Sequence, residues 1–349
     1  EISCSLVGSE MCIRDREMTI NDMPAVLVEM NGQGFDILWI GDSGDLYFLM
    51  FPNDDDAFVQ QALEVGQSLR VFHRKDERVN PASDFDCTAE NGEVTITDYT
   101  GTREHVLIPS EIGGFPVTAL ADKAFYEKHV TTVVVPDSVT EIEGNPFKNC
   151  KALRTVDLSP NHPLLTVQDG MLIDHVHQRV LRRLTTGAVC IVPEGIKEIA
   201  DGAFGRIPEL TEITLPGSLE KIGEAAFIYC GMREITIPKG IAEIARMAFY
   251  HCDQLETVHL QEGLRGIGWD AFSECASLSD IRLPNTLERI ELRAFAHCTS
   301  LKQLTIPASV TTLYAGFVDA DTVLLVERGS TMETWLQEEG YQYTLVEVE

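Results

Sequence analysis

Two histidines separated by one residue are the side chains with the clearest metal-binding spacing. In the stretch Asp174-His175-Val176-His177 the two imidazoles would share one face of a strand, and Asp169 or His162 would complete a ligand set. The stretch also falls where the tip of a hairpin is expected, and an exposed polar turn explains it without a metal. We therefore expect no metal and no other cofactor, and keep a metal-dependent enzyme as a remote alternative.

A serine in a glycine-rich loop is the candidate for nucleophilic catalysis. The loop Gly41-Asp42-Ser43-Gly44 resembles the nucleophile loop of trypsin-like serine proteases. That mechanism needs a histidine to accept the serine proton, and no histidine lies within 29 residues of Ser43. The loop is predicted to be a hairpin turn, and we expect that the chain is not an enzyme.

Three arginines close to the histidine pair form the densest basic cluster of the chain. Arg179, Arg182 and Arg183 follow the predicted hairpin tip. The sequence predicts that they form a solvated face of the hairpin. Contact with an acidic or sulfated partner is the alternative.

The overall charge excludes one large class of partners. The 349 residues include 55 Asp and Glu against 27 Lys and Arg, a net charge of −28. Binding of nucleic acid depends on a basic surface, so we expect no nucleic-acid partner. A hydrophobic content of 44% is sufficient for a sizeable core. Because apolar runs of about 18 residues are missing from the sequence, we expect no membrane span.

A repeated unit is the strongest signal in the sequence. Phenylalanines, most of them preceded by alanine, recur at intervals of 22 or 23 residues, with one interval of 57. They are Phe125, Phe147, Phe204, Phe227, Phe249, Phe272, Phe295 and Phe317. A proline keeps the same period in seven units, and a cysteine lies three residues after the phenylalanine in five. One unit cannot bury its own apolar face, so the repeat predicts a stacked solenoid.

Each unit begins with a predicted strand that has one buried side. In the unit around Ile281 and Leu283 these two residues point inward, and their neighbours point outward. A proline then ends the strand because it cannot donate a backbone hydrogen bond. The phased cysteines are predicted to pack as small buried side chains beside the phenylalanines, because their number is odd without Cys4 and Cys12 and no close-set CxxC pair is present. Stacking could bring neighbouring cysteines within bridging distance, so their pairing stays open.

These features resemble the BspA-like leucine-rich repeat family, whose units read close to L-x-x-I-x-I-P-x-S-V-x-x-I-x-x-x-A-F-x-x-C. The resemblance covers residues 84–326, and it implies a repeat solenoid with parallel strands on one face. Within the long interval, residues 159–188 are predicted to form an inserted hairpin. Residues 327–349 are predicted to cap the stack with a helix near residues 330–340.

The N-terminal part does not follow the repeat. Residues 1–16 contain SLVGSEMCIRDR, which resembles translated sequencing-adaptor read-through, and we read them as a probable artefact. Residues 17–80 are predicted to form a small α/β element. Its three strands lie at residues 25–30, 35–40 and 46–51, and a helix follows from about residue 53 to residue 66.

The outward positions of the predicted strands form the expected binding surface, which we call the strand face. It consists of Glu212 and Thr214, Glu234 and Thr236, Thr257 and His259, Asp280 and Arg282, and Gln303 and Thr305. Val189 and Ile191 hold the same register one unit earlier. Threonine is also simply a good exposed strand residue, and that explanation stays open.

The resemblance implies a non-catalytic protein that binds an unknown protein or a glycan-bearing surface, as in protein–protein interaction or bacterial adhesion. We expect a monomer. An intracellular scaffold or sensor, with its specificity in residues 17–80, is the alternative. A signal peptide upstream of Glu17 would favour the adhesin, and a start at Met18 would favour the intracellular protein. Family analogy suggests a cell-surface or secreted protein, but no signal peptide is visible, and the localisation stays open.

Overall fold

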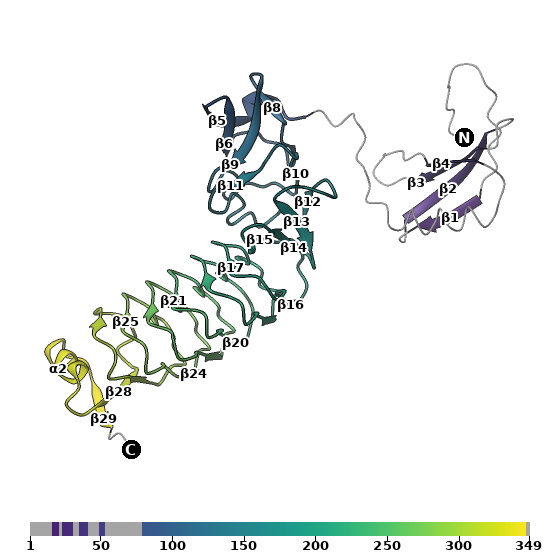
Figure 1. Ribbon diagram of the computed structural model, residues 1–349. Helices are drawn as coiled ribbons and strands as arrows, with labels where there is room; N and C mark the ends of the chain where they lie inside the picture. The colour runs from purple at the N-terminus through teal and green to yellow at the C-terminus, as the bar shows by residue number, and fades with distance from the viewer. Residues whose placement is uncertain (1–15, 21–22, 31–34, 41–48, 53–78, 347–349) are drawn as a thin grey trace. The chain divides into compact units, whose positions relative to one another are not determined.

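The chain divides into two compact units, Glu1–Arg78 and Val79–Glu349 (Figure 1). The computed structural model describes residues 16–20, 23–30, 35–40, 49–52 and 79–346. Among these residues, no helix combines the length and the apolar composition needed to cross a bilayer.

The first unit contains an antiparallel meander of four strands. They are β1 (Arg16–Ile20), β2 (Met23–Met30), β3 (Phe35–Ile40) and β4 (Leu49–Pro52), paired in that order. The sequence pattern does not predict β1, which pairs residue by residue with β2 from Arg16 onward. Residues 1–15, the Ser43 loop and the helix expected after residue 53 lie outside the described residues.

The second unit begins with an antiparallel hairpin and then becomes a parallel solenoid. The hairpin is β5 (Phe85–Glu90) with β6 (Glu93–Tyr99). β9 (Phe115–Leu120) pairs in parallel with β6, and β11 (Glu141–Ile142) pairs in parallel with β9. The short β8 (Glu111–Ile112) pairs with β9 in the antiparallel direction. A separate parallel sheet holds β7 (His105–Leu107), β10 (Thr132–Val134) and β12 (Thr155–Asp157).

Each later turn of the solenoid carries two strands, one in each of two columns (Figure 1). The first column bears the strand face and contains β16 (Val189–Ile191), β18 (Glu212–Thr214), β20 (Glu234–Thr236), β22 (Thr257–His259), β24 (Asp280–Ile281), β26 (Gln303–Ile306) and β28 (Val323–Glu327). The second column contains β17 (Glu198–Ile199), β19 (Lys221–Ile222), β21 (Glu243–Ile244), β23 (Gly266–Ile267), β25 (Arg289–Ile290) and β27 (Thr312–Leu313). These six strands continue one nine-stranded sheet, here called the second sheet.

The second sheet is a feature that the sequence pattern does not predict. Its strands in the regular turns are two residues long, and each generally buries one aliphatic side chain, such as Ile222 or Ile244. A two-residue strand shows no alternation, so periodicity cannot reveal it. The strands of the first column follow the predicted register: Ile235 is buried between two exposed neighbours, and Val258 is buried between the half-buried Thr257 and the exposed His259.

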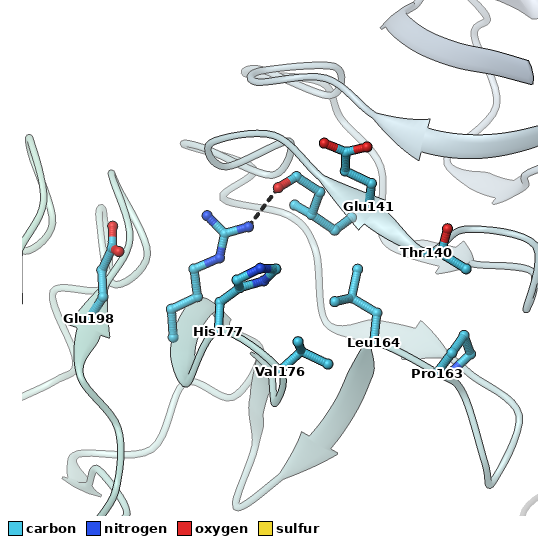
Figure 2. A pocket seen from close by; sticks show the side chains of 9 residues that line it. Thr140, Glu141, Pro163, Leu164, Val176, His177 and Glu198 are labelled. Atoms are coloured by element: carbon cyan, nitrogen blue, oxygen red, sulfur yellow. Dashed lines mark hydrogen bonds between the residues drawn. The ribbon is translucent and has the colours of Figure 1, made fainter. Parts of the chain in front are cut away.

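The residues between the turns of Phe147 and Phe204 form three antiparallel strands. They are β13 (Leu165–Gln168), β14 (Met171–Asp174) and β15 (Arg179–Arg183). β15 then pairs in parallel with β17, so these strands begin the second sheet. A cleft lies between β11 and the loops of this hairpin insert (Figure 2).

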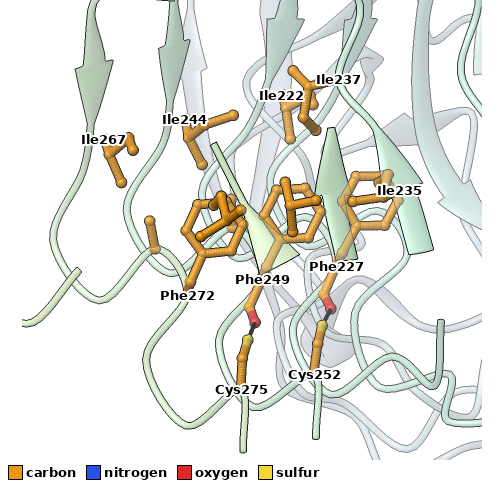
Figure 3. Close-up of a cluster of buried hydrophobic side chains, with 14 of the residues drawn as sticks. Ile222, Phe227, Ile235, Ile237, Ile244, Phe249, Cys252, Ile267, Phe272 and Cys275 are labelled. Carbon is orange, nitrogen blue, oxygen red and sulfur yellow. Dashed lines mark hydrogen bonds between the residues drawn. The ribbon is translucent and has the colours of Figure 1, made fainter. Parts of the chain in front are cut away.

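The core of the solenoid is a ladder of stacked rings. Phe227, Phe249 and Phe272 are fully buried, with centroids 5.3 and 5.2 Å apart and nearly parallel planes. Such offset pairs contribute about 1 kcal/mol each beyond the burial of their area. Each phased thiol donates to the phenylalanine carbonyl of the preceding turn, as Cys252 does to Phe227 at 3.1 Å (Figure 3). The predicted cysteine ladder is confirmed, and it also satisfies a backbone acceptor.

The C-terminal end of the stack is covered by a helix and one more strand. Helix α2 (Thr331–Glu338) buries Met332 and Leu336, and the Ser330 hydroxyl accepts from the Glu333 backbone nitrogen at 3.2 Å. The Glu333 carboxylate in turn accepts from the Gly329 backbone nitrogen at 2.6 Å, one residue before the Ser330 N-cap, and so satisfies a second backbone donor beside the start of the helix. Strand β29 (Tyr343–Val346) pairs in parallel with β28.

Candidate functional site

The strand face is a continuous row of exposed side chains on parallel strands. Nine of its ten predicted residues are exposed, and Thr257 is half-buried. Parallel register places Glu234 beside Thr257, and Thr257 beside Asp280, on three successive turns. Because the main chain fixes these strands, the side chains project from a rigid surface.

The strand face leaves acidic groups without partners. Glu234 pairs with His259, with 2.6 Å between Oε1 and Nε2. Within the described part of the chain, Glu212 and Asp280 have no side-chain hydrogen bond or ion pair. Their carboxylates are therefore available to a basic partner.

Two apolar side chains lie at the start of this surface. Val189 and Ile191 on β16 are 57% and 65% exposed. Parallel pairing places Val189 beside Glu212, and Ile191 beside Thr214. The alternation of the strand predicts that these two side chains point outward. The sequence also shows that they differ from later units, because the same register positions there hold mostly polar residues.

The outward side chains of the second sheet pair with one another. Lys221 contacts Glu198 on the preceding turn at 2.8 Å. Arg289 reaches past Gly266 to Glu243, two turns away, at 3.0 Å. The hydrogen bond to Glu243 is the main cause that raises the pKa of Arg289. This face satisfies its own charges between turns.

The predicted solvated arginine face of the hairpin is wrong, because the arginines bind backbone carbonyls inside the fold. Arg182 is 1% exposed, and its Nη1 donates to the carbonyls of Gly202 and Gly205 at 3.1 and 3.2 Å. Burial lowers its pKa to about 10. Arg183 is 3% exposed and donates to the carbonyl of Gly187 at 2.6 Å.

Arg179 also has a structural role, at the base of the hairpin tip. Its Nε donates to Asp174 at 2.9 Å, and its Nη2 donates to the carbonyl of Ile142 at 2.6 Å. Asp174 is fully buried. The three arginines are therefore already bound within the fold, and the alternative prediction, that they contact an acidic or sulfated partner, is not supported by their positions.

The two histidines of the hairpin tip are exposed but do not form a metal site. His177 Nδ1 lies 2.8 Å from Asp174 Oδ2, and His175 Nε2 lies 3.4 Å from the carbonyl oxygen of His162. The buried His162 accepts from the Leu164 and Leu165 nitrogens through Nδ1. Across residues 79–346 and the described strands before them, no three His, Cys, Asp or Glu side chains are placed to hold a metal.

The remaining predicted candidates lie in an exposed turn, in the core or outside the described residues. Asp169 lies in the turn between β13 and β14, at the opposite end of the hairpin from Asp174. Ser43 lies outside the described residues. Burial raises the pKa of the Cys150, Cys230 and Cys298 thiols to about 12, so these cysteines are poor nucleophiles at neutral pH.

The cleft is the feature of this region that sequence reasoning missed. Its volume is about 660 Å³, within the range of ligand sites. It is lined by Thr140, Glu141, Ile142, Pro163, Leu164, Val176, His177, Arg179 and Glu198 (Figure 2). These residues come from β11 and the residue before it, the insert and β17, so only the folded chain brings them together.

Comparison with known proteins agrees with this architecture. The family model described as BspA type Leucine rich repeat region matches residues 118–171 and 191–319 in six copies. A leucine-rich repeat protein from Eubacterium ventriosum is 21% identical with a TM-score of 0.52, over 64% of this chain and 67% of that one. This similarity shows the fold.

Two further solved structures are similar over more of the chain but superimpose less well. A leucine-rich repeat protein of T. pallidum is 23% identical with a TM-score of 0.35, over 78% of this chain and 100% of that one. A leucine-rich cell surface protein of Faecalibacterium prausnitzii is 20% identical with a TM-score of 0.31, over 78% and 96%.

No curated protein matches the chain. The family match spans more than half of the residues and coincides with the turns that carry the ring and thiol ladders. The chain belongs to the BspA type leucine-rich repeat family.

Proposed function

We propose that this protein is a non-catalytic binding protein that captures a protein partner through its strand face. One observation carries the proposal. The exposed apolar pair Val189 and Ile191 lies in register with the acidic and polar side chains of β18. An exposed apolar patch with a polar rim is typical of protein interaction sites.

The charges of the strand face favour a basic partner surface. Glu212 has no partner in the described part of the chain, and neither has Asp280 three turns further along. The net charge of −28 would also attract a basic protein over a longer range. We therefore propose a partner with an apolar patch flanked by lysine or arginine, and adhesion to a protein-bearing surface is one form of such capture.

The solenoid supports this function because it orders the surface before binding. Strand pairing holds the outward side chains of β20, β22 and β24 at fixed spacing. A preordered surface loses less conformational entropy on association than a flexible one.

Substitution of the apolar pair tests the proposal. Photo-crosslinking from a probe at Thr214 first identifies a partner whose crosslink is competed by unlabelled protein. Biolayer interferometry then compares Val189→Ser/Ile191→Ser with Leu292→Ser/Tyr314→Ser, a matched pair of exposed apolar residues that follow β25 and β27.

We expect the strand-face pair to weaken partner binding about tenfold or more, because buried apolar anchors dominate interface energies. The control pair should change the affinity less than about twofold. Equal effects of the two pairs, or no effect of either, would overturn the assignment of the strand face.

A further inference from the structure

We infer that His162 is an acid-sensitive latch, which holds the first strand of the hairpin insert in place at neutral pH and releases it more often in acid. His162 comes just before Pro163 and Leu164, which line the cleft (Figure 2). Release of this segment would therefore change one wall of the cleft. The inference is independent of the proposed capture of a partner by the strand face.

The latch consists of a buried imidazole that accepts two backbone hydrogen bonds. His162 is 4% exposed. Its Nδ1 lies 3.2 Å from the Leu164 nitrogen and 3.1 Å from the Leu165 nitrogen. A backbone N–H group can only donate, so Nδ1 keeps its lone pair and the proton of the neutral ring is on Nε2. The neutral ring in this tautomer therefore fixes the chain where it enters β13.

The segment that the latch holds is part of the core. Leu164 and Leu165 are buried in the hydrophobic cluster that also contains Phe125 and Phe147. The Leu164 carbonyl accepts from the His175 backbone nitrogen at 3.1 Å, which joins the segment to the hairpin tip. Without the His162 acceptor, two backbone donors beside this core would lose their partner, and exposure to water would satisfy them.

Protonation of His162 removes that acceptor. A proton on Nδ1 would place a third donor against the two backbone N–H groups, so both hydrogen bonds are lost. The ring would also carry a positive charge in a buried position, where it is poorly solvated. Both effects are relieved when the ring and the segment that it holds move into water, so acid favours the open form.

Two other titratable groups face the ring. Asp137, in the turn after β10, favours the charged form, and His175, at the hairpin tip, opposes it. The Asp137 carboxylate already accepts from the Ser159 hydroxyl at 2.6 Å. Burial is the largest influence, and it lowers the pKa of His162 below 6.5 although Asp137 and the Pro136 carbonyl act in the other direction.

The direction of the pH dependence follows from these contacts. When the ring is in water, it has its ordinary pKa of 6.5, so the open form binds more protons than the docked form below that pH. The docked form has its full stability above pH 6.5 and loses stability as the pH falls towards its own lower pKa. Over this interval the population of the open form rises by up to about tenfold per pH unit.

Hydrogen exchange in the full chain measures this opening. Mass spectrometry follows the amides of residues 164–168 at about pH 7.5 and about pH 5, with the intrinsic exchange rate corrected at each pH. His162→Asn is the main variant, because its side-chain oxygen can accept in place of Nδ1 and does not titrate. His175→Gln is the matched control, since it removes the neighbouring imidazole and leaves the latch.

We expect the protection of these amides in the wild-type protein to fall about fivefold or more from pH 7.5 to pH 5. The fall should be less than about twofold in His162→Asn, whereas His175→Gln should keep most of it. The His162 ring should titrate below pH 6.5, as observed by NMR of ¹³C-labelled histidine Cε1, with the peak identified by its loss in His162→Asn.

Three outcomes would overturn the inference. They are protection in the wild-type protein that does not change with pH, an equal fall in His162→Asn, and a His162 ring that titrates at or above pH 6.5. The ring titration needs only the wild-type protein to be folded, so it stays decisive if the asparagine variant is unstable. No partner enters these measurements, so their failure would leave the strand-face proposal unaffected.

Discussion

The second sheet and the strand face are built on the same turns of the solenoid, but their charged side chains differ in whether they are paired. On the second sheet, Arg289 and Lys221 pair with carboxylates of neighbouring turns. On the strand face, Glu212 and Asp280 have no such partner in the described part of the chain, and Val189 and Ile191 are exposed. A face that satisfies its own groups supports the stack, whereas a face with unsatisfied groups is available to a partner.

Removing one ring of the phenylalanine ladder should destabilise the core on which both faces depend. Phe249→Ala deletes a fully buried ring that stacks on Phe227 and Phe272 at 5.3 and 5.2 Å. We expect a loss of about 4 kcal/mol in the free energy of unfolding, measured by urea denaturation, because a cavity replaces the ring. A loss below about 1 kcal/mol would show that the stacked rings are not a main source of the stability of the fold.

Removing one buried thiol should have a smaller effect that depends on pH. The Cys230 thiol donates to the Phe204 carbonyl at 3.1 Å, so Cys230→Ala leaves that acceptor without its partner. We expect a loss of about 1 to 2 kcal/mol at pH 7, measured by urea denaturation.

The sign of the pH dependence follows from burial of the thiol. Burial raises the Cys230 pKa from 9.0 to about 12, so between these values the folded state binds more protons than the unfolded state. This contribution to stability is complete below pH 9 and falls as the pH rises towards 12. The advantage of the wild-type protein over Cys230→Ala should therefore shrink between about pH 9 and about pH 11, and a growing advantage would contradict the burial of this thiol.

Neutralising one charge on each face should give the smallest effect and sharpen the contrast. Arg289→Gln breaks the contact with Glu243, and we expect a loss of about 0.5 kcal/mol, since the side chain is 37% exposed. About 0.5 M salt should remove most of this difference in thermal unfolding. Asp280→Asn should lose no stability, because Asp280 has no ion pair in the described part of the chain. Equal losses for the two variants would remove the distinction between the faces.

The regular turns could be predicted from the sequence because each residue type recurs at a fixed register. The inward Ile235, the buried Phe249 and the buried Cys252 all follow from the spacing alone. The second sheet could not be predicted, since each of its regular strands contributes about one buried residue, and pairing between turns defines it.

The region of the hairpin insert shows why the rest of the candidate site could not be predicted from the sequence. Arg182 was expected in solvent, but it lies in the core and donates to the carbonyls of Gly202 and Gly205. Because every residue has a backbone carbonyl, the pattern of side chains cannot reveal such acceptors. The cleft joins Glu141 to Val176 across the inserted strands. Its residues have no common period, so only the fold shows that they meet.

The central claim is that the strand face binds the partner, and matched charge reversal tests it most directly. One variant carries Glu212→Lys, Glu234→Lys and Asp280→Lys, and its control carries Glu127→Lys, Glu288→Lys and Glu338→Lys, all exposed and outside the strand face. Each set contains one carboxylate with an ion pair, Glu234 with His259 and Glu288 with Arg265. Both sets change the net charge equally, and affinity for the crosslinked partner is measured at one salt concentration.

We predict that the strand-face set weakens binding about tenfold or more, while the control set changes it less than about threefold and both proteins stay folded. Equal weakening by the two sets, or unchanged binding by the strand-face set, would contradict the assignment of the binding surface.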